Sequence, residues 1–438
     1  MNRHVRYRGW SAGSDTPCAD GFPSFPPSTP DATHAGTDTG TDAGTDAGTD
    51  AGTAGAATAP TEAALDAVPT AAGLTMPASV DGARAVEAAC WTSPEVETGF
   101  AATELIASWN ATTPPGSWIE VEVSATLADG SRTGWLALGR WAETDVDIEP
   151  ASVSGQDDGR VLVDFDVLRA HPGQALVGYR LRVRLLRRPG TPGPAVSHLG
   201  AMTSAVPARS EPDAGVPSPP DPAAASDGRP AAWGRVLDVP RLSQQVHRGE
   251  YPQWDSGGES WCSPTSTTMV LGHWERWPDP AEYSWVDESL ADRVVDHAAR
   301  RTFDHNYRGA GNWSFNTAYA ARYGVRAYVT RLRGLHEAEA FIAAGVPLVA
   351  SVSFTRAELD GAGYETEGHL LTVVGFDENG DVVSHDPASH GEPSNDAVRA
   401  VYDRAQFERV WLAPSGGLVY VIHPVDVPLP ARGDEPNW

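Results

Sequence analysis

The segment GGESWCSPTSTTMVLGHW, residues 257–274, decides how the second half of the chain is interpreted. Its two leading glycines allow a sharp approach, Pro264 suits the first turn of a helix, and the Thr-Met-Val-Leu run continues that helix. We therefore expect a helix over residues 263–274 with Cys262 at its N-terminus. Unpaired backbone N–H groups and the helix dipole favour a thiolate there, and the thiolate is the reactive form. For a cysteine taken alone, the alternative is a small buried apolar residue.

A nucleophilic cysteine needs a base, and GHLLTVVGFD, residues 368–377, places His369 at the head of an apolar strand. Asp386 follows in DVVSHDPA, residues 381–388, at the end of the expected neighbouring strand of a hairpin. Antiparallel pairing would bring Asp386 close to His369, where a carboxylate fixes the tautomer of the imidazole. The alternatives are a structural histidine and an Asp-Pro turn.

Acyl transfer also needs hydrogen-bond donors for the developing oxyanion. The backbone N–H of Cys262 supplies one, and an upstream side-chain amide would supply the other. Gln244, in VPRLSQ at residues 239–244, is our choice. Gln245 and Gln253 lie close by, and spacing does not separate the three.

Composition divides the 438-residue chain into five segments. Residues 1–21 contain a candidate first strand, and residues 22–75 are a low-complexity Ala, Gly, Thr, Asp and Pro segment that we expect to be disordered. Residues 76–205 alternate polar and apolar positions, as in an all-β sandwich-like domain. Residues 206–232 have the composition of a linker. Residues 233–430 mix helices with a later run of strands, which is an α+β order.

The β-rich region contains three period-two runs, at residues 118–126, 160–168 and 176–185, which we expect to be strands. It is also rich in tryptophan. Core or edge packing is the favoured role of these side chains, and stacking on glycan rings is the alternative; the residues are Trp109, Trp118, Trp135 and Trp141.

Charge and cysteine content exclude several classes of protein. The chain has 32 basic and 58 acidic residues, so its net charge is 32 − 58 = −26, which argues against a nucleic-acid or anionic-membrane partner. No run of about 18 apolar residues predicts a transmembrane segment, and residues 1–20 show no secretory signal. Three cysteines are too few, and odd in number, for a disulfide scaffold. One Cys18–Cys90 bridge is possible, and it would leave Cys262 as a free thiol.

Four motifs in order resemble the C39-like peptidases of the papain-like cysteine peptidase superfamily, over about residues 233–424. They are VPRLSQ, WCSPTS, GHLLTVVGF and HDPA, which contain Gln244, Cys262, His369 and Asp386 respectively. The resemblance implies a papain-like fold and hydrolysis of a peptide or amide bond through a thioester. In it Cys262 attacks, His369 transfers the proton, Asp386 orients His369 and Gln244 completes the oxyanion hole.

The resemblance also suggests partners and a location. SWNATTPPGSW, residues 108–118, is similar to the β-rich domain that precedes such peptidases in actinobacterial secreted proteins. We therefore expect a peptide or protein substrate, cell-wall peptide included, at an extracellular or cell-surface location, with no cofactor or metal. His385 and His390 beside Asp386 form no recognised metal motif.

Two other functions stay open at this point. One is a wall- or glycan-binding protein whose peptidase-like domain is inactive. The other is an acyltransferase of the transglutaminase type, which shares the order Cys, His and Asp.

Overall fold

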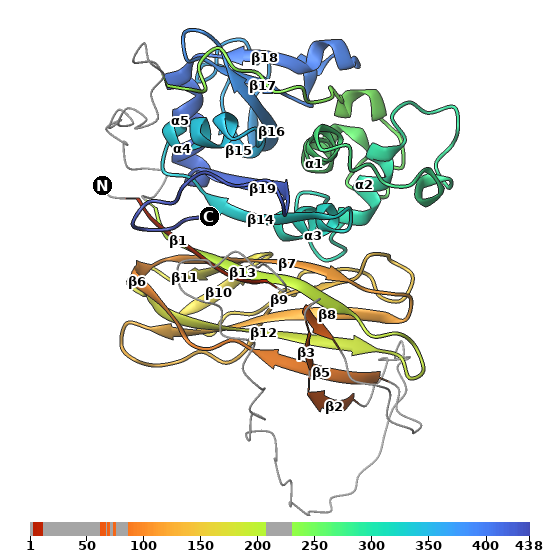
Figure 1. The fold of residues 1–438 in the computed structure, drawn as a ribbon, viewed down its shortest axis with the longest axis vertical. Helices are drawn as coiled ribbons and strands as arrows, with labels where there is room; N and C mark the ends of the chain where they lie inside the picture. The colour runs from red at the N-terminus through yellow and green to blue at the C-terminus, as the bar shows by residue number, and fades with distance from the viewer. Residues whose placement is uncertain (1–2, 12–61, 67, 71–72, 76–85, 207–229) are drawn as a thin grey trace, which may run out of the picture.

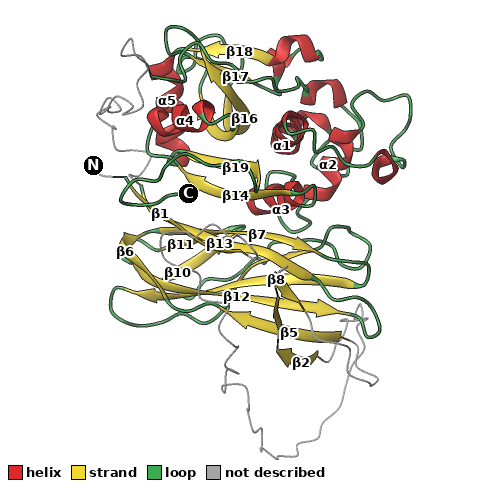
Figure 2. Cartoon of the chain, in the orientation of Figure 1, coloured by secondary structure: helices red, strands yellow, loops and turns green. Residues whose placement is uncertain are grey.

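The computed structural model describes residues 3–11, 62–66, 68–70, 73–75, 86–206 and 230–438. The disorder expected for residues 22–61 and the linker expected for residues 207–229 lie outside these residues, as does Cys18. Within them, a two-layered β domain lies against a second domain that contains all the helices (Figures 1 and 2). No helix in the described ranges is both long and apolar enough to cross a membrane.

The β domain consists of two sheets that lie face to face around a shared apolar core (Figure 1). One sheet has the order β10-β11-β7-β13-β4-β3, with β1 paired to β13. The other has the order β2-β5-β12-β8-β9, with β6 paired to β12. The strands are β1 (His4–Ser11), β2 (Glu62–Asp66), β3 (Val68–Thr70), β4 (Gly73–Thr75), β5 (Val86–Thr92), β6 (Val96–Ala102), β7 (Glu104–Thr112), β8 (Ser117–Leu127), β9 (Leu136–Trp141), β10 (Val161–Asp164), β11 (Val167–Ala170), β12 (Leu176–Arg187) and β13 (Ala195–Ala205).

Two expectations for this domain were wrong. The segment expected to be disordered as far as residue 75 contains β2, β3 and β4, because backbone pairing with β5 and β13 orders residues whose composition is poor in apolar side chains. The run at residues 160–168 is not one strand. It is the hairpin β10–β11, which turns at Phe165, where φ is +55°.

The four tryptophans pack within the protein rather than forming an exposed platform. Trp109 and Trp141 are fully buried in the shared core. Trp118 packs against a small apolar cluster, and Trp135 lies under the guanidinium of Arg182 at 4.3 Å. Core and edge packing therefore accounts for all four side chains.

The second domain is built on one antiparallel sheet in the order β14-β19-β15-β16-β17-β18. Its helices are α1 (Cys262–His273), α2 (Val294–Thr302), α3 (Trp313–Ala321), α4 (Leu335–Ala343) and α5 (Arg404–Ser415). Its strands are β14 (Val325–Arg331), β15 (Leu348–Phe354), β16 (Thr366–Phe376), β17 (Val382–His385), β18 (Arg399–Tyr402) and β19 (Leu418–Pro424). Three helices precede the first strand, so the mixed helix-and-sheet order agrees with the α+β expectation.

The two domains share an apolar interface, in which β7 and β13 face α3 and β14 (Figure 1). Polar side chains of β7 also bond the backbone of the second domain. Asn110 Nδ2 donates to the carbonyl of Ala327 at 2.7 Å, and Ser108 Oγ accepts from the N–H of Val329 at 2.9 Å. This interface brings the hairpin β10–β11 to the edge of a cavity in the second domain.

Candidate active site

Cys262 is the first residue of α1, a helix that is buried from Ser263 to Leu271. A short 3₁₀ turn, η2 (Gly258–Ser260), leads into it. A Cβ on Gly258 would lie 2.4 Å from the Gln244 carbonyl oxygen, so only glycine allows this approach to the turn η1 (Gln244–His247). Cys262 itself is partly exposed and lines a cavity. The helix starts one residue earlier than expected, and Cys262 is at its N-terminus.

Helix α1 is attached to the strand that contains His369. Ser266 Oγ donates to the carbonyl oxygen of Leu370 at 3.1 Å, next to His369 in β16. The strand begins at Thr366, so His369 is its fourth residue rather than its head. Gly368 has open space where a Cβ would project, which leaves the flank of His369 accessible from the cavity.

Strand pairing brings Asp386 to His369. β16 and β17 form an antiparallel hairpin in which Thr372 faces His385, and Asp386 follows directly. His369 Nε2 and Asp386 Oδ1 are 2.8 Å apart, and both side chains are buried. The antiparallel pairing therefore places these two residues as the sequence predicts.

Asp386 accepts three further hydrogen bonds that the sequence did not suggest. Its Oδ2 accepts from the hydroxyl groups of Tyr364 at 2.8 Å and Tyr402 at 2.7 Å, and its Oδ1 accepts from the N–H of Ala388 at 2.9 Å. The Tyr364 ring also meets the His369 ring edge-on, with the centroids 5.6 Å apart. These donors hold the carboxylate ionised and fix its direction.

The environment favours a protonated imidazole. Burial alone would lower the pKa of His369, but the Asp386 carboxylate and a hydrogen bond with Cys262 raise that pKa to about 10. Burial would likewise raise the pKa of Asp386, but His369 and the two tyrosine hydroxyls hold it below its usual range. The arrangement thus stabilises a positive His369 between a carboxylate and a sulfur atom.

Two of the three candidate glutamines lie at the cavity, Gln244 and Gln245; Gln253 is exposed and is not among the lining residues. Gln244 is buried, and its Nε2 donates to the carbonyl of Glu259 at 2.6 Å. The second N–H of that amide is available to another acceptor. Gln245 Oε1 accepts from Arg248 at 2.6 Å.

The cavity has a volume of about 610 Å³ and contains Gln244, Cys262 and His369 in its lining. The hairpin β10–β11 of the β domain forms one wall through Asp164, Phe165, Asp166, Val167 and Arg169. Phe165 is 42% exposed, and its ring centroid is 4.6 Å from that of Tyr307. The sequence does not predict this contribution, because it depends on how the two domains pack.

The hairpin is bonded to helix α3 at its tip. Asp166 Oδ2 accepts from the N–H of Trp313, the first residue of α3, at 2.7 Å. Burial raises the pKa of Asp166 to about 7. Trp313 lines the cavity, whereas Phe315 of the same helix is buried in the β-domain core.

Acidic side chains predominate around the cavity. The lining has one arginine, Arg169, which forms an ion pair with Asp164 at 3.2 Å. The acidic lining residues are Asp164, Asp166, Asp255, Glu259 and Glu365. The cavity therefore presents more carboxyl groups than basic side chains to anything that enters it.

His385 and His390 do not join Asp386 in a metal cluster. The Nδ1 atoms of both rings face backbone carbonyl oxygens, those of Pro240 at 3.3 Å and Ala362 at 3.0 Å. Asp386 turns instead toward His369 and the two tyrosines.

Two family models match the chain, one on each domain. Residues 33–204 match the Peptidase C39 N-terminal domain, and residues 236–418 match the Peptidase C39-like family. No curated protein matches.

Two solved structures are similar to part of the chain. One, described as a double glycine motif protease from an AMS/PCAT transporter in complex with the leader peptide, is 15% identical and covers 44% of this chain and 95% of its own, with a TM-score of 0.21. A putative C39-like peptidase from Bacillus anthracis is 16% identical and covers 43% and 96%, with a TM-score of 0.25.

Proposed function

Residues 236–418 are a domain of the C39-like peptidase family, and from this premise we propose that the protein is a cysteine peptidase of papain-like fold. The observation that supports the proposal best is the hydrogen bond between His369 and Asp386, formed beside a cysteine at a helix N-terminus on one cavity. Cys262 is the proposed nucleophile, His369 the acid and base, and Asp386 the residue that orients His369.

The proposed reaction has two halves. The Cys262 thiolate attacks the carbonyl carbon of the scissile amide, and the carbonyl oxygen becomes an oxyanion. Protonated His369 then gives its proton to the leaving nitrogen, the C–N bond breaks, and a thioester remains. Water attacks the thioester while neutral His369 takes its proton. The C–S bond breaks, the acid product leaves, and the thiolate and imidazolium return.

The oxyanion needs donors that point to the place where its charge develops. The N–H of Cys262 at the start of α1 is one candidate, since the first N–H groups of a helix have no partner within it. The unused N–H of Gln244 Nε2 is the other, because this side chain lines the same cavity. We assign the oxyanion hole to these two groups.

The substrate we propose is a peptide that carries basic residues near the cleaved bond. The excess of carboxylates around the cavity attracts positive side chains and repels acidic ones. Phe165 and Tyr307 offer an aromatic surface for an apolar side chain of the same peptide.

A digest of a proteome-derived peptide library with the purified full-length chain tests the function. We expect cleavage by the wild type and at least a ~10³-fold loss in Cys262→Ala, since the nucleophile is removed. Retention of full cleavage by Cys262→Ala would exclude the mechanism. The library also reports residue preference, and enrichment of acidic residues at the cleavage sites would contradict the substrate assignment.

Two further measurements separate the alternatives. A catalytic thiolate should react quickly with iodoacetamide below pH 7, with the adduct mapped to Cys262 by mass spectrometry. A binding protein with an inactive domain would leave that thiol slow to react. Incorporation of an amine tag into a protein substrate, without hydrolysis, would instead identify an acyltransferase.

A further inference from the structure

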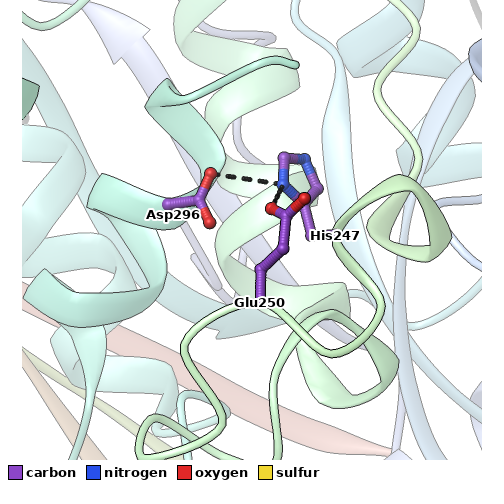
Figure 3. Close-up of side chains that lie close together, drawn as sticks. All are labelled: His247, Glu250 and Asp296. Carbon is purple, nitrogen blue, oxygen red and sulfur yellow. Dashed lines mark hydrogen bonds and ion pairs between the residues drawn. The ribbon is translucent and has the colours of Figure 1, made fainter. Parts of the chain in front are cut away.

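A second group of buried titratable side chains lies away from Cys262, between the turn η1 and helix α2 (Figure 3). It consists of His247 at the end of η1, Glu250 just beyond, and Asp296 in the first turn of α2. His247 Nδ1 is 2.9 Å from Glu250 Oε2 and 3.2 Å from Asp296 Oδ2. One ligand atom from each residue lies within 4.8 Å of the others.

The group has too few hydrogen-bond donors for its carboxylate oxygens. His247 Nδ1 carries at most one hydrogen, and the hydrogen bond it forms is with Glu250. Asp296 has no exposed surface, and among the described residues neither of its oxygens accepts a hydrogen bond. Its carboxylate is nevertheless directed at His247 (Figure 3). A buried carboxylate without a donor is costly, so the arrangement calls for a positive partner.

Asp296 is an exception among the buried carboxylates of the described residues. Every other one accepts at least one hydrogen bond from a backbone N–H, an arginine, a tryptophan, an asparagine, a histidine or a tyrosine. These are Glu87, Glu120, Glu122, Asp166, Asp304, Glu337, Glu339 and Asp386. The protein thus satisfies buried carboxylates wherever the structure describes them, except at Asp296.

We propose that His247, Glu250 and Asp296 bind a divalent first-row transition ion, for which Zn²⁺ is the probe. One imidazole nitrogen and two carboxylates are ligands that Zn²⁺ accepts, at bond lengths of about 2.0–2.2 Å. Tetrahedral bonds of this length place neighbouring ligand atoms about 3.3–3.6 Å apart. The separations of 2.9 and 3.2 Å found here would open by a few tenths of an ångström to admit the ion. The ion would bond to the Asp296 carboxylate, which accepts no hydrogen bond among the described residues, and would take the place of the proton on His247 Nδ1.

The position of this site defines what the ion would do. His247 and Gln244 belong to the same four-residue turn, while Asp296 belongs to α2, which packs on α1. The His247 ring also packs on Trp261, the residue before Cys262, with the centroids 5.9 Å apart. A bound ion would therefore fix η1 to α2. The side chain of Glu250 is 16% exposed and gives the ion a path from the surface.

Zinc titration of the full-length chain tests the site. The Cys262→Ala background is used throughout, because a thiolate beside a histidine also binds Zn²⁺. After EDTA treatment and desalting, we expect calorimetry and elemental analysis to show that the parent chain binds one Zn²⁺. Substitution of Asp296 should abolish this binding. At a free Zn²⁺ concentration about a hundredfold above Kd, the Tm should rise by about 5 °C or more.

Two ligand variants and one control decide the outcome. In the Cys262→Ala background, Asp296→Asn and Glu250→Gln should each weaken binding at least about tenfold and remove the Tm rise. Glu250 is partly exposed, so its variant remains informative should Asp296→Asn fail to fold. Asp157→Asn, which removes the exposed His171–Asp157 pair, should leave Zn²⁺ affinity unchanged. Equal affinity in all variants, or no binding by the parent, would overturn the proposal.

Discussion

Two buried histidine–carboxylate groups lie on elements that pack against helix α1, and they differ in how their carboxylates are satisfied. Asp386 accepts from His369, Tyr364, Tyr402 and the N–H of Ala388. Asp296 accepts from no hydrogen-bond donor in the described residues. The two groups share residue types and burial, so the difference comes from the side chains around them.

The difference shows two ways in which a protein accommodates a buried carboxylate. Surrounding donors can hold it, and its charge then acts on one neighbour, as Asp386 acts on His369. Without hydrogen-bond donors it depends on a cationic neighbour, as Asp296 does on His247 at 3.2 Å. The first arrangement suits orientation of a catalytic group, and the second suits binding.

The largest expected effect comes from removing the charge of the satisfied carboxylate. Asp386→Asn should lower kcat on the order of 10²- to 10⁴-fold, because His369 loses the group that orients it and stabilises its positive form. The pKa of His369, about 10 in the native protein, should fall. The alkaline limb of the pH–rate profile should therefore move to lower pH. An unchanged limb would contradict the role given to Asp386.

A stability measurement distinguishes the two carboxylates by the size of the effect. In EDTA, Asp386→Asn should lower the free energy of unfolding by about 2–5 kcal/mol, because it disrupts a fully bonded buried charge. Asp296→Asn should lower it by less, about 0–1.5 kcal/mol, because loss of the ion pair with His247 is offset by removal of a buried carboxylate that lacks hydrogen-bond donors. Urea unfolding at pH 7 gives both values. Destabilisation of similar size in both variants would remove the distinction.

The tyrosine donors test what satisfies Asp386. Tyr402→Phe should cost about 1.5–3 kcal/mol of stability near neutral pH, since one hydrogen bond to a buried charge is lost. It should also raise the pKa of Asp386, which that hydroxyl lowers. The stability contributed by the ionised carboxylate is present above its unfolded pKa and is lost as the pH falls through its folded pKa. In the variant this loss should start at a higher pH, as urea unfolding between pH 3 and 6 would show.

The smallest effect is expected outside both groups, in the wall supplied by the β domain. Phe165→Ala should raise KM by roughly 2- to 10-fold for a cleaved peptide and leave kcat within about twofold, because the side chain lines the cavity on the β-domain wall and would meet the substrate but not the reacting atoms. Val146→Ala, an exposed apolar residue of the same domain that does not line the cavity, is the control. A fall in kcat would mean that Phe165 acts on the catalytic group.

The sequence was informative where function depends on local pattern. The proline after Cys262 and the apolar run behind it predicted α1 to within one residue, and the hairpin of β16 and β17 followed from alternating strands and a turn. The four motifs predicted that Gln244, Cys262 and His369 belong to one site, and all three line one cavity. The catalytic roles of these residues stay predictions.

Long-range contacts account for what the sequence did not predict. Tyr402 reaches Asp386 from β18, a strand too short to stand out by periodicity, and Tyr364 reaches it from a loop. The strands at residues 62–75 exist because of their pairing partners. Helix α2 begins after Arg293 without a side-chain N-cap, so no start signal in the sequence points to Asp296.

The bond from Asp166 to the start of α3 has a consequence for how such proteins change by recombination. A crossover between the two domains would join the cavity of the second domain to the β10–β11 hairpin of another protein. That hairpin would have to form one wall of the cavity and accept a hydrogen bond from the N–H of Trp313. Exchange of one domain without the other would therefore change the cavity wall and the acceptor of the Trp313 N–H. An exchange that keeps residues 160–170 with the second domain should preserve the original preference for substrate, whatever sheet carries them.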